Sequence, residues 1–376
     1  MDIIVGTALV NKLGGVRSHI STLMQSLQSS EHRANLISLE NVKLTDILKA
    51  GLKAGGHRET AYRELVAARA KRAQEKTETM LRHGNFQIIH AHDVLYGNAV
   101  LRHSLPVVLT VHGPMSREAK MLKLGKESFY HYLVEQERAA YQGADYIITV
   151  DSGQKEIIVN DYNIDPAKIT VILNAVSVPA ILPSEEQRQY KPYFLVPRRL
   201  VAKSGVAVAI EALKLFSSNP CELWITGDGP EYKALRELSR KLGILERVRF
   251  LGQVDHKRML HLMADSQAVI IPSVPIEGVI EASSISALEA MSLSKPVLAS
   301  NIGGLQEIIR DGYNGLLFEA GNAHALTALM EKVTADEKYA RALGCCAKEY
   351  VAAKHNVTSW LKQILDVYEK TLIFDR

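Results

Sequence analysis

Two carboxylates eight residues apart, Glu281 and Glu289, stand in the part of the chain best suited to holding a polar ligand. Apolar runs typical of buried strands flank them, at residues 268–271 and 296–299. The sequence between these runs predicts a loop and then a helix, with Glu281 just before the helix and Glu289 one or two turns inside it. Such a loop lies at the carboxyl edge of a parallel sheet, where open α/β folds bind their ligands.

The chemistry of this segment fits a ligand that carries both hydroxyls and phosphates. Two carboxylates can accept hydrogen bonds from two separate sets of hydroxyl groups. A helix that begins between them offers backbone N–H groups to a phosphate. A sugar nucleotide has hydroxyls at both ends and phosphates in between. The competing interpretation makes Ser286 the N-cap and Glu289 the end of a capping box, which leaves only a short helix before Pro296.

A glycine pair follows the first strand expected in the first half of the chain. Gly14 and Gly15 come after the first strand and open a helix, where backbone N–H groups can face an anion. This is not the Gly-x-Gly-x-x-Gly pattern of a dinucleotide site, so no nicotinamide cofactor is expected.

Histidines end the next two strands. His90 and His92, with Asp93, end the third strand, and His112 ends the fourth, where a parallel sheet presents side chains to a ligand. Two histidines two residues apart can share a metal ion, but the neighbouring sequence shows no clear third ligand, so no metal site is predicted. His90 is explained equally well as a structural histidine.

The segment from 281 to 289 resembles the Glu-x7-Glu signature of glycosyltransferase family 4, whose members are retaining enzymes with the GT-B fold. The resemblance implies that Glu281 contacts donor-sugar hydroxyls and Glu289 the nucleotide ribose. Where the family often has Gly-aromatic-Gly, this chain has Ala282, Ser283 and Ser284. Because glycine lets backbone approach a ligand closely, a serine hydroxyl is expected to replace part of that contact.

The resemblance extends to the loop and turn that follow the first two strands of the second half. Arg199 and Lys203 stand in the loop that grips the donor diphosphate in the family, although the commoner spacing would place the lysine at Ser204. Guanidinium binds phosphate as a bidentate fork and ammonium as a point charge. The alternative is a loop of solvated basic residues.

Gly227 and Gly229 match a Gly-x-Gly-Pro turn that lies close to the nucleotide in the family. Taken alone, they would be a good strand-to-helix turn.

In the first half, Gly14 and Gly15 match a family loop close to the donor phosphates or the acceptor. His112 matches the family histidine that approaches the donor sugar, where an imidazole can donate to a hydroxyl or stabilise charge on the departing phosphate. Asn174 resembles the asparagine of the family's domain junction. No Asp-x-Asp motif stands in these loops. We therefore expect no metal and no cofactor, with basic residues and helix N-termini neutralising the leaving diphosphate.

The elements that position these residues form two alternating series of strands and helices. The strands are expected at 2–5, 34–39, 87–90, 107–111, 146–150 and 169–173, and then at 193–196, 222–226, 247–251, 268–271, 296–299 and 315–318. This alternation predicts an α/β protein with two doubly wound parallel sheets facing a cleft. The expected domains are 1–180, on the acceptor side, and 193–355, which binds the nucleotide sugar. A linker at 181–192 joins them, and the resemblance implies that a helix at 356–376 packs back on the first domain.

Composition is that of an ordinary soluble globular protein, with 376 residues, 23% charged and 47% hydrophobic. The apolar runs are far shorter than the roughly 18 residues of a spanning helix. The three cysteines suit neither a disulfide framework nor a zinc site. These features predict a reduced, cytoplasmic protein.

A basic stretch from residue 43 to 82 carries ten Lys/Arg against five acids, while the whole chain has a net charge of +4. Leu44, Ile47, Leu48 and Leu52 recur there at helical spacing. A basic amphipathic helix of this kind can lie on an anionic membrane. The alternative, which we favour, is a helix with a solvated face that packs its apolar side on its own domain.

Together these features predict a retaining, metal-independent glycosyltransferase. It would move a hexose-type sugar from a UDP- or GDP-sugar to a glycan or lipid-linked acceptor in cell-surface polysaccharide or glycolipid synthesis. No nucleic-acid partner is expected, and peripheral membrane contact is an open option. Two alternatives remain: a sugar-nucleotide epimerase, for which Asp93 is the clearest first-domain carboxylate, and a non-catalytic binding subunit, to which residues 282–284 point.

Overall fold

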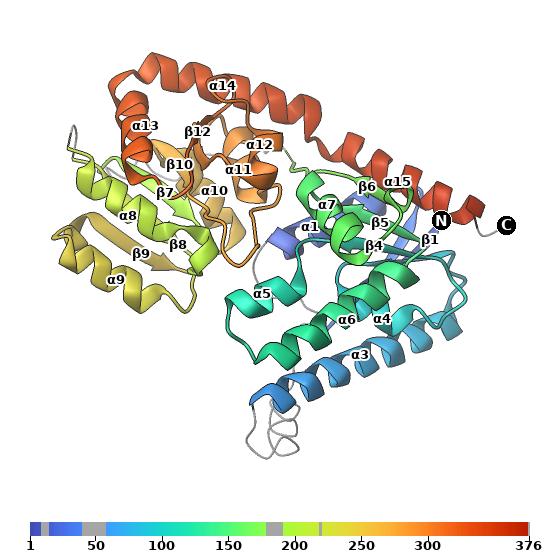
Figure 1. The fold of residues 1–376 in the computed structure, drawn as a ribbon. Coiled ribbons are helices and arrows are strands. Elements are labelled where there is room, and N and C mark those ends of the chain that lie inside the picture. The colour runs from blue at the N-terminus through green and yellow to red at the C-terminus, as the bar shows by residue number, and fades with distance from the viewer. Residues whose placement is uncertain (9–14, 40–57, 178–190, 218–219, 375–376) are drawn as a thin grey trace. The chain divides into compact units, whose positions relative to one another are not determined.

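Strands and helices alternate along both halves of the chain in the computed structural model, which describes residues 1–8, 15–39, 58–177, 191–217 and 220–374. The chain divides into a first unit, Met1–Asn174 with Val357–Arg376, and a second unit, Ala175–Asn356. Each unit contains one six-stranded parallel sheet with helices packed against it (Figure 1). The predicted α/β fold with two parallel sheets is confirmed.

The sheet of the first unit changes winding direction between β1 and β3. Its strand order is β2-β1-β3-β4-β5-β6. The strands are β1 (Asp2–Thr7), β2 (Arg33–Ser38), β3 (Ile88–Ala91), β4 (Val107–Val111), β5 (Tyr146–Thr149) and β6 (Ile169–Val171). The reversal of order makes the carboxyl ends of β1 and β3 a topological switch point, the usual ligand position of doubly wound sheets.

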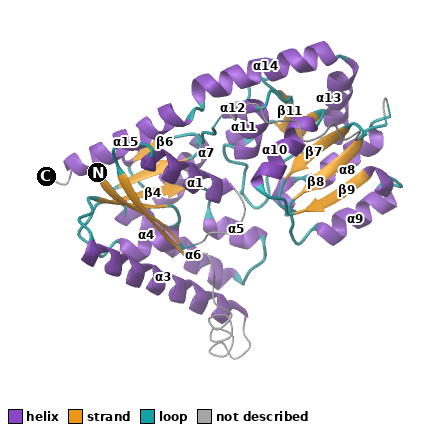
Figure 2. Cartoon of the chain, turned by 180° about the vertical axis from the view of Figure 1, so that it is seen from behind, coloured by secondary structure: helices purple, strands orange, loops and turns teal. Residues whose placement is uncertain are grey.

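Helices cover both faces of this sheet. They are α1 (Gly15–Gln28), α3 (Arg58–His83), α4 (Val94–Val100), α5 (Met115–Met121), α6 (Glu127–Gly143), α7 (Ser152–Tyr162) and α15 (Val357–Phe374). α3, α4 and α6 lie side by side, and α1 packs against α15 (Figures 1 and 2). On β3, Ala91 lies against α4 while His90 binds Tyr368 of α15. Because successive strand residues point to opposite faces, α4 and α15 cover opposite sides.

The second unit has the strand order β12-β11-β10-β7-β8-β9. Its strands are β7 (Tyr193–Pro197), β8 (Glu222–Thr226), β9 (Val248–Gly252), β10 (Ala268–Ile271), β11 (Val297–Ser300) and β12 (Leu316–Phe318). In chain order this is the 3-2-1-4-5-6 arrangement of dinucleotide-binding folds, so the switch point lies between β7 and β10. The loops after these two strands therefore begin side by side.

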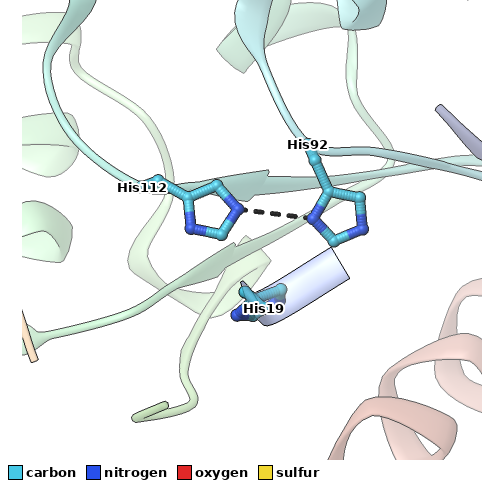
Figure 3. Close-up of side chains that lie close together, drawn as sticks. All are labelled: His19, His92 and His112. Carbon is cyan, nitrogen blue, oxygen red and sulfur yellow. Dashed lines mark hydrogen bonds between the residues drawn. The ribbon is translucent and has the colours of Figure 1, made fainter. Parts of the chain in front are cut away.

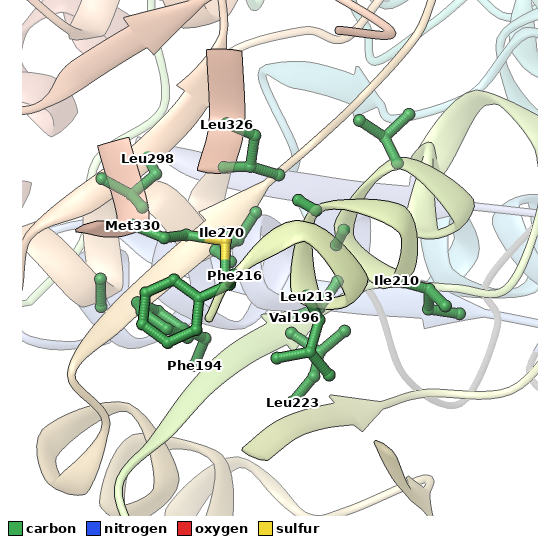
Figure 4. Packing of buried hydrophobic residues seen from close by; sticks show 14 of the residues in the cluster. Phe194, Val196, Ile210, Leu213, Phe216, Leu223, Ile270, Leu298, Leu326 and Met330 are labelled. Atoms are coloured by element: carbon green, nitrogen blue, oxygen red, sulfur yellow. The ribbon is translucent and has the colours of Figure 1, made fainter. Parts of the chain in front are cut away.

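The core of the second unit explains why its strands are apolar runs. Its helices are α8 (Val206–Leu215), α9 (Tyr232–Lys241), α10 (His256–Asp265), α11 (Ile285–Ser292), α12 (Gly303–Ile308), α13 (Ala323–Ala335) and α14 (Glu337–Lys354). Phe194 of β7 packs on Phe216 after α8 and belongs to one cluster with Leu213 and Met330 (Figure 4). Each such side chain contributes about 1.5–3 kcal/mol on burial.

The described part of the basic stretch is α3, which packs against α4. Three of its basic side chains bind backbone carbonyls of the first unit: Arg63 that of Ser128, Arg69 that of Ala8 and Lys76 that of Ser38. Leu44, Ile47, Leu48 and Leu52 lie outside the described residues. Among the helices that are described, none combines the length and apolar character needed to cross a membrane.

Candidate functional site

A two-pronged ion pair occupies the switch point of the second unit. Arg198, directly after β7, donates from Nη1 to Oε1 of Glu281 at 2.8 Å and from Nη2 to Oε2 at 2.5 Å. Ser273, which follows β10, donates to the same Oε2 at 3.2 Å. Both charged side chains are about nine-tenths buried, at 11% and 10% exposure. The loops after β7 and β10 are thus joined through Glu281.

The charges around Glu281 keep it ionised. Burial alone would raise the pKa of this carboxyl, but the opposing effects of Arg198, Lys203 and Ser273 outweigh burial and lower it. Lys203, in the short 3-10 turn Ala202–Ser204, therefore acts electrostatically on Glu281, and its backbone carbonyl accepts from Val274 N at 2.9 Å.

Sequence reasoning did not single out Arg198. The resemblance favours Arg199 as the arginine that binds the diphosphate, which stays a prediction; Arg198 is the arginine that pairs with Glu281, and Arg199 is exposed. Both residues are arginines, and they follow β7 one after the other, so residue type does not distinguish them. The path of the backbone directly after Pro197 decides which of the two adjacent arginines reaches the switch point.

Glycines fasten the loop that carries Glu281. Gly304 N donates to the carbonyl of Glu281 at 2.9 Å. A Cβ on Gly303 would lie 2.3 Å from that carbonyl oxygen, and one on Gly304 would lie 2.4 Å from Ser283 N. No side chain fits at either position, so the Gly-Gly start of α12 fixes the backbone on which Glu281 stands.

Gly227 and Gly229, both predicted site residues, allow the turn after β8 to contact the backbone of the loop after β7. A Cβ on Gly227 would approach the Arg198 carbonyl to 2.3 Å, and one on Gly229 the Leu200 carbonyl to 2.3 Å. Leu200 N in turn donates to the Asp228 carbonyl at 3.0 Å. The turn after β8 therefore packs directly on the loop after β7, which carries Arg198.

Glu289 lies in the second turn of α11 and is 9% exposed. The N-cap of α11 is Ser284, whose side chain makes no capping hydrogen bond, so the capping-box interpretation with Ser286 as N-cap is wrong. Ser283 and Ser284 are buried, and Ala282 is half-buried. The serine-rich turn thus forms the entry to α11.

A histidine that sequence reasoning missed binds Glu289. His256 Nε2 lies 2.8 Å from Glu289 Oε1, and this hydrogen bond raises the pKa of His256 despite partial burial. His256 is the first residue of α10, after the N-cap Asp255. The sequence marks the helix start but carries no signal that its first side chain meets a carboxylate 33 residues later.

In the first unit, two of the predicted strand-end residues, His90 and Asp93, are held by hydrogen bonds within the fold. His90 is structural: Nδ1 lies 2.6 Å from Tyr368 Oη and Nε2 lies 2.7 Å from Thr110 Oγ1. Asp93 is also engaged, because it caps α4 through Tyr96 N and binds Thr7 Oγ1 and Ala8 N.

His112 is half-buried, and its Nε2 lies 3.3 Å from Nδ1 of buried His92. Burial, reinforced by neighbouring histidines, holds the pKa of both imidazoles well below its usual value, so they are neutral at pH 7. Gly15 is the exposed first residue of α1, and Gly14 lies outside the described residues.

Comparison with known proteins agrees with this architecture. Two family models match the chain, Glycosyltransferase Family 4 over residues 13–178 and Glycosyl transferases group 1 over residues 178–350. An uncharacterised glycosyltransferase of Methanocaldococcus jannaschii is 25% identical over 381 residues, which cover 95% of this chain and 94% of that protein. A second uncharacterised glycosyltransferase of that organism is 30% identical over 264 residues, covering 70% and 67% respectively.

The fold is shared with a solved structure. The Anabaena protein HepE, crystallised in complex with UDP-glucose, matches with a TM-score of 0.73 and 19% identity, over 98% of this chain and 99% of that one. The two parallel sheets, one in each unit, agree with the GT-B fold of this structural neighbour. The chain belongs to the glycosyltransferases, as a family 4 member with the GT-B fold.

Proposed function

We propose that this glycosyltransferase moves a hexose-type sugar from a UDP- or GDP-sugar to a glycan or lipid-linked acceptor and retains the anomeric configuration. The observation that carries the proposal is the placement of Glu281 and Glu289 on either side of the α11 N-terminus, at the carboxyl edge of one sheet. Two oriented carboxylates and a helix start match the hydroxyl–phosphate–hydroxyl order of such a donor.

In this proposal Glu281 accepts hydrogen bonds from donor-sugar hydroxyls. Its Oε1 accepts one bond from Arg198 and retains a second lone pair, because a carboxylate oxygen can accept two bonds. Arg198 acts as a positioning residue: its fork fixes the plane of the carboxylate before the sugar arrives. Glu289, held by His256, would contact the ribose.

The donor diphosphate would lie at the α11 N-terminus and beside the loop after β7, which carries Arg199 and Lys203. Lys203 and Arg199 would supply positive charge as the bond to the leaving phosphate breaks, with no metal required. HepE, which binds UDP-glucose, supports a nucleoside-diphosphate sugar as the donor class.

The proposed chemistry is a front-face displacement. The bond from the anomeric carbon to the β-phosphate oxygen breaks, and its electron pair stays on the phosphate. The acceptor oxygen bonds to the anomeric carbon on the same face and gives its proton to the leaving phosphate. His112 would donate to a sugar hydroxyl during this step, in its neutral form.

The engagement of Asp93 argues against the epimerase alternative. Both of its carboxylate oxygens already serve the fold, one capping α4 and the other binding Thr7 and Ala8. An epimerase would need that carboxylate for substrate chemistry.

An anionic membrane is a weaker proposed partner, resting on residues 43–82 and a lipid-linked acceptor. Arg63, Arg69 and Lys76 are held by the first unit itself. Co-sedimentation with anionic vesicles at low and high salt tests it, since such attraction is screened over about 10 Å at 0.1 M salt. No sedimentation at low salt would assign the stretch to ordinary helix surface.

A donor screen tests the main proposal. The chain is incubated with a panel of UDP- and GDP-hexoses, and nucleotide release to water is followed together with the anomeric proton of the product by NMR. We expect slow release from one donor class and a product sugar that first appears with the donor's own configuration. An altered sugar still attached to nucleotide would establish an epimerase, and binding without any turnover would establish a binding subunit.

A further inference from the structure

Three histidines that are far apart in the sequence meet in the first unit. His19 comes from α1, His92 follows β3 and His112 follows β4 (Figure 3). One ring nitrogen of each lies within 4.8 Å of those of the other two. His19 and His92 are buried, and His112 is half-buried.

We propose that His19, His92 and His112 form a binding site for a transition-metal ion such as Zn²⁺. The sequence alone offered only His90 and His92 as a pair without a third ligand. The fold removes His90 from that pair, because Tyr368 and Thr110 occupy both of its nitrogens. It supplies two other imidazoles in its place.

The spacing of His92 and His112 is that of two ligands on one ion. Their facing nitrogens, Nδ1 and Nε2, lie 3.3 Å apart, at the long end for a hydrogen bond. Zinc binds histidine nitrogen at about 2.0–2.1 Å with tetrahedral angles, which places two ligand nitrogens about 3.3–3.4 Å apart. Figure 3 shows the two nitrogens pointing at one another, with the His19 ring beside them.

The third imidazole is already oriented for metal binding. His19 Nδ1 lies 2.8 Å from the side-chain oxygen of Asn174, an acceptor, so Nδ1 carries the proton and Nε2 carries the lone pair. That Nε2 is buried and has no hydrogen-bond partner among the described residues. In zinc sites a ligating histidine usually donates its other N–H to an oxygen, which fixes the tautomer and the orientation of the ring.

The donor set defines the class of ion. Three neutral imidazoles favour Zn²⁺, Co²⁺, Ni²⁺ or Cu²⁺, whereas Mg²⁺ and Ca²⁺ require oxygen ligands. A lone pair left buried without a partner is unfavourable, and metal ligation would remove that cost at His19. A water or another group would complete the tetrahedral coordination as the fourth ligand.

Metal binding to the isolated chain tests the proposal directly, with any affinity tag removed and the protein first stripped with a chelator. We expect one equivalent of Co²⁺ to produce the intense visible ligand-field bands of a tetrahedral site, and Zn²⁺ to displace it. Mg²⁺ should produce no competition. Absence of these bands in the wild-type chain would overturn the proposal.

Variants locate the site. His19→Gln should abolish the Co²⁺ bands, and Asn174→Ala should weaken Zn²⁺ binding about 10- to 100-fold while all three ligands remain. His131→Gln, which removes an exposed histidine of α6, is the matched control and should leave the Co²⁺ bands and the Zn²⁺ affinity unchanged. Circular dichroism checks that each variant is folded. Bands that survive in folded His19→Gln, or unchanged affinity in Asn174→Ala, would place the metal elsewhere. The test needs no donor sugar, so it stands apart from the proposed transfer reaction.

Discussion

Arg198 holds Glu281 by both oxygens, with Nη1 and Oε1 2.8 Å apart, at the point where the winding of the second sheet reverses. Each side chain is about nine-tenths buried, so each compensates the buried charge of the other. The pair therefore combines two tasks: it joins the loops after β7 and β10, and it orients the carboxylate that we propose binds the donor sugar.

Arg198→Ala should destabilise the protein by about 3–5 kcal/mol, because it leaves Glu281 buried without its partner. The free energy of unfolding from urea titration measures this. Arg240→Ala, which breaks an exposed pair with Glu237, is the control and should cost at most about 1 kcal/mol. Equal effects of the two variants would show that the buried pair is not essential to the fold.

Glu281→Ala and Glu289→Ala should each slow sugar transfer at least tenfold to hundredfold, since a hydrogen bond to a charged group contributes about 1.5–3 kcal/mol. Initial rates with the donor identified by the screen provide the measurement. Glu237→Ala, an exposed glutamate of α9, should match the wild type. Full activity in either site variant would remove that carboxylate from the donor site.

Lys203→Ala and Arg199→Ala should weaken binding of free UDP or GDP, because each removes positive charge from the loop after β7. Lys203→Ala should also raise the pKa of Glu281, whose lowered value depends partly on this lysine. Isothermal titration with the nucleotide decides the first effect. Unchanged affinity in both variants would assign the two residues to the solvated surface.

Sugar transfer should continue in EDTA without added divalent metal. The reason is that Lys203, Arg199 and the α11 N-terminus are proposed to neutralise the leaving diphosphate. If the histidine site described above holds Zn²⁺, that ion would occupy His112, so chelation should leave the rate unchanged or raise it. Loss of transfer on chelation, restored by Mg²⁺ or Mn²⁺, would contradict this expectation.

The first unit should lose stability in mild acid. Burial lowers the pKa of His90 from 6.5 to about 3, so between these values the unfolded chain binds a proton that the folded chain excludes. Stability is therefore fully present above pH 6.5 and falls as the pH drops below it, by on the order of 2 kcal/mol near pH 5. His19, with a pKa of about 4, acts in the same direction.

Urea titrations from about pH 7.5 to 5, in EDTA, measure this loss. His90→Gln should show a shallower decline with pH than the wild type, whereas His131→Gln should reproduce the wild-type slope. Identical slopes in all three proteins would mean that the buried imidazole is not the group that responds to acid.

The sequence by itself determined the strands and the position of the two carboxylates. Residues 107–111, 222–226 and 268–271 are strands at the predicted bounds, because a strand buried on both faces is a short, largely apolar run. Glu281 precedes a helix and Glu289 lies inside it for the same local reason. Where apolar residues continue past a strand, as at Ile172, the predicted end was too late, since Ile172 is buried without being part of the strand.

Only the tertiary structure decided which side chains meet. Arg198 rather than Arg199 reaches Glu281, His256 reaches Glu289, and His19 joins His92 and His112. Hydrophobic periodicity encodes local conformation and which face is buried. Contacts between polar groups on separate elements depend instead on strand order, on the direction of one side chain at a strand end, and on glycines that let two loops touch. These are properties of the packed sheet as a whole, and no segment of the sequence carries them alone.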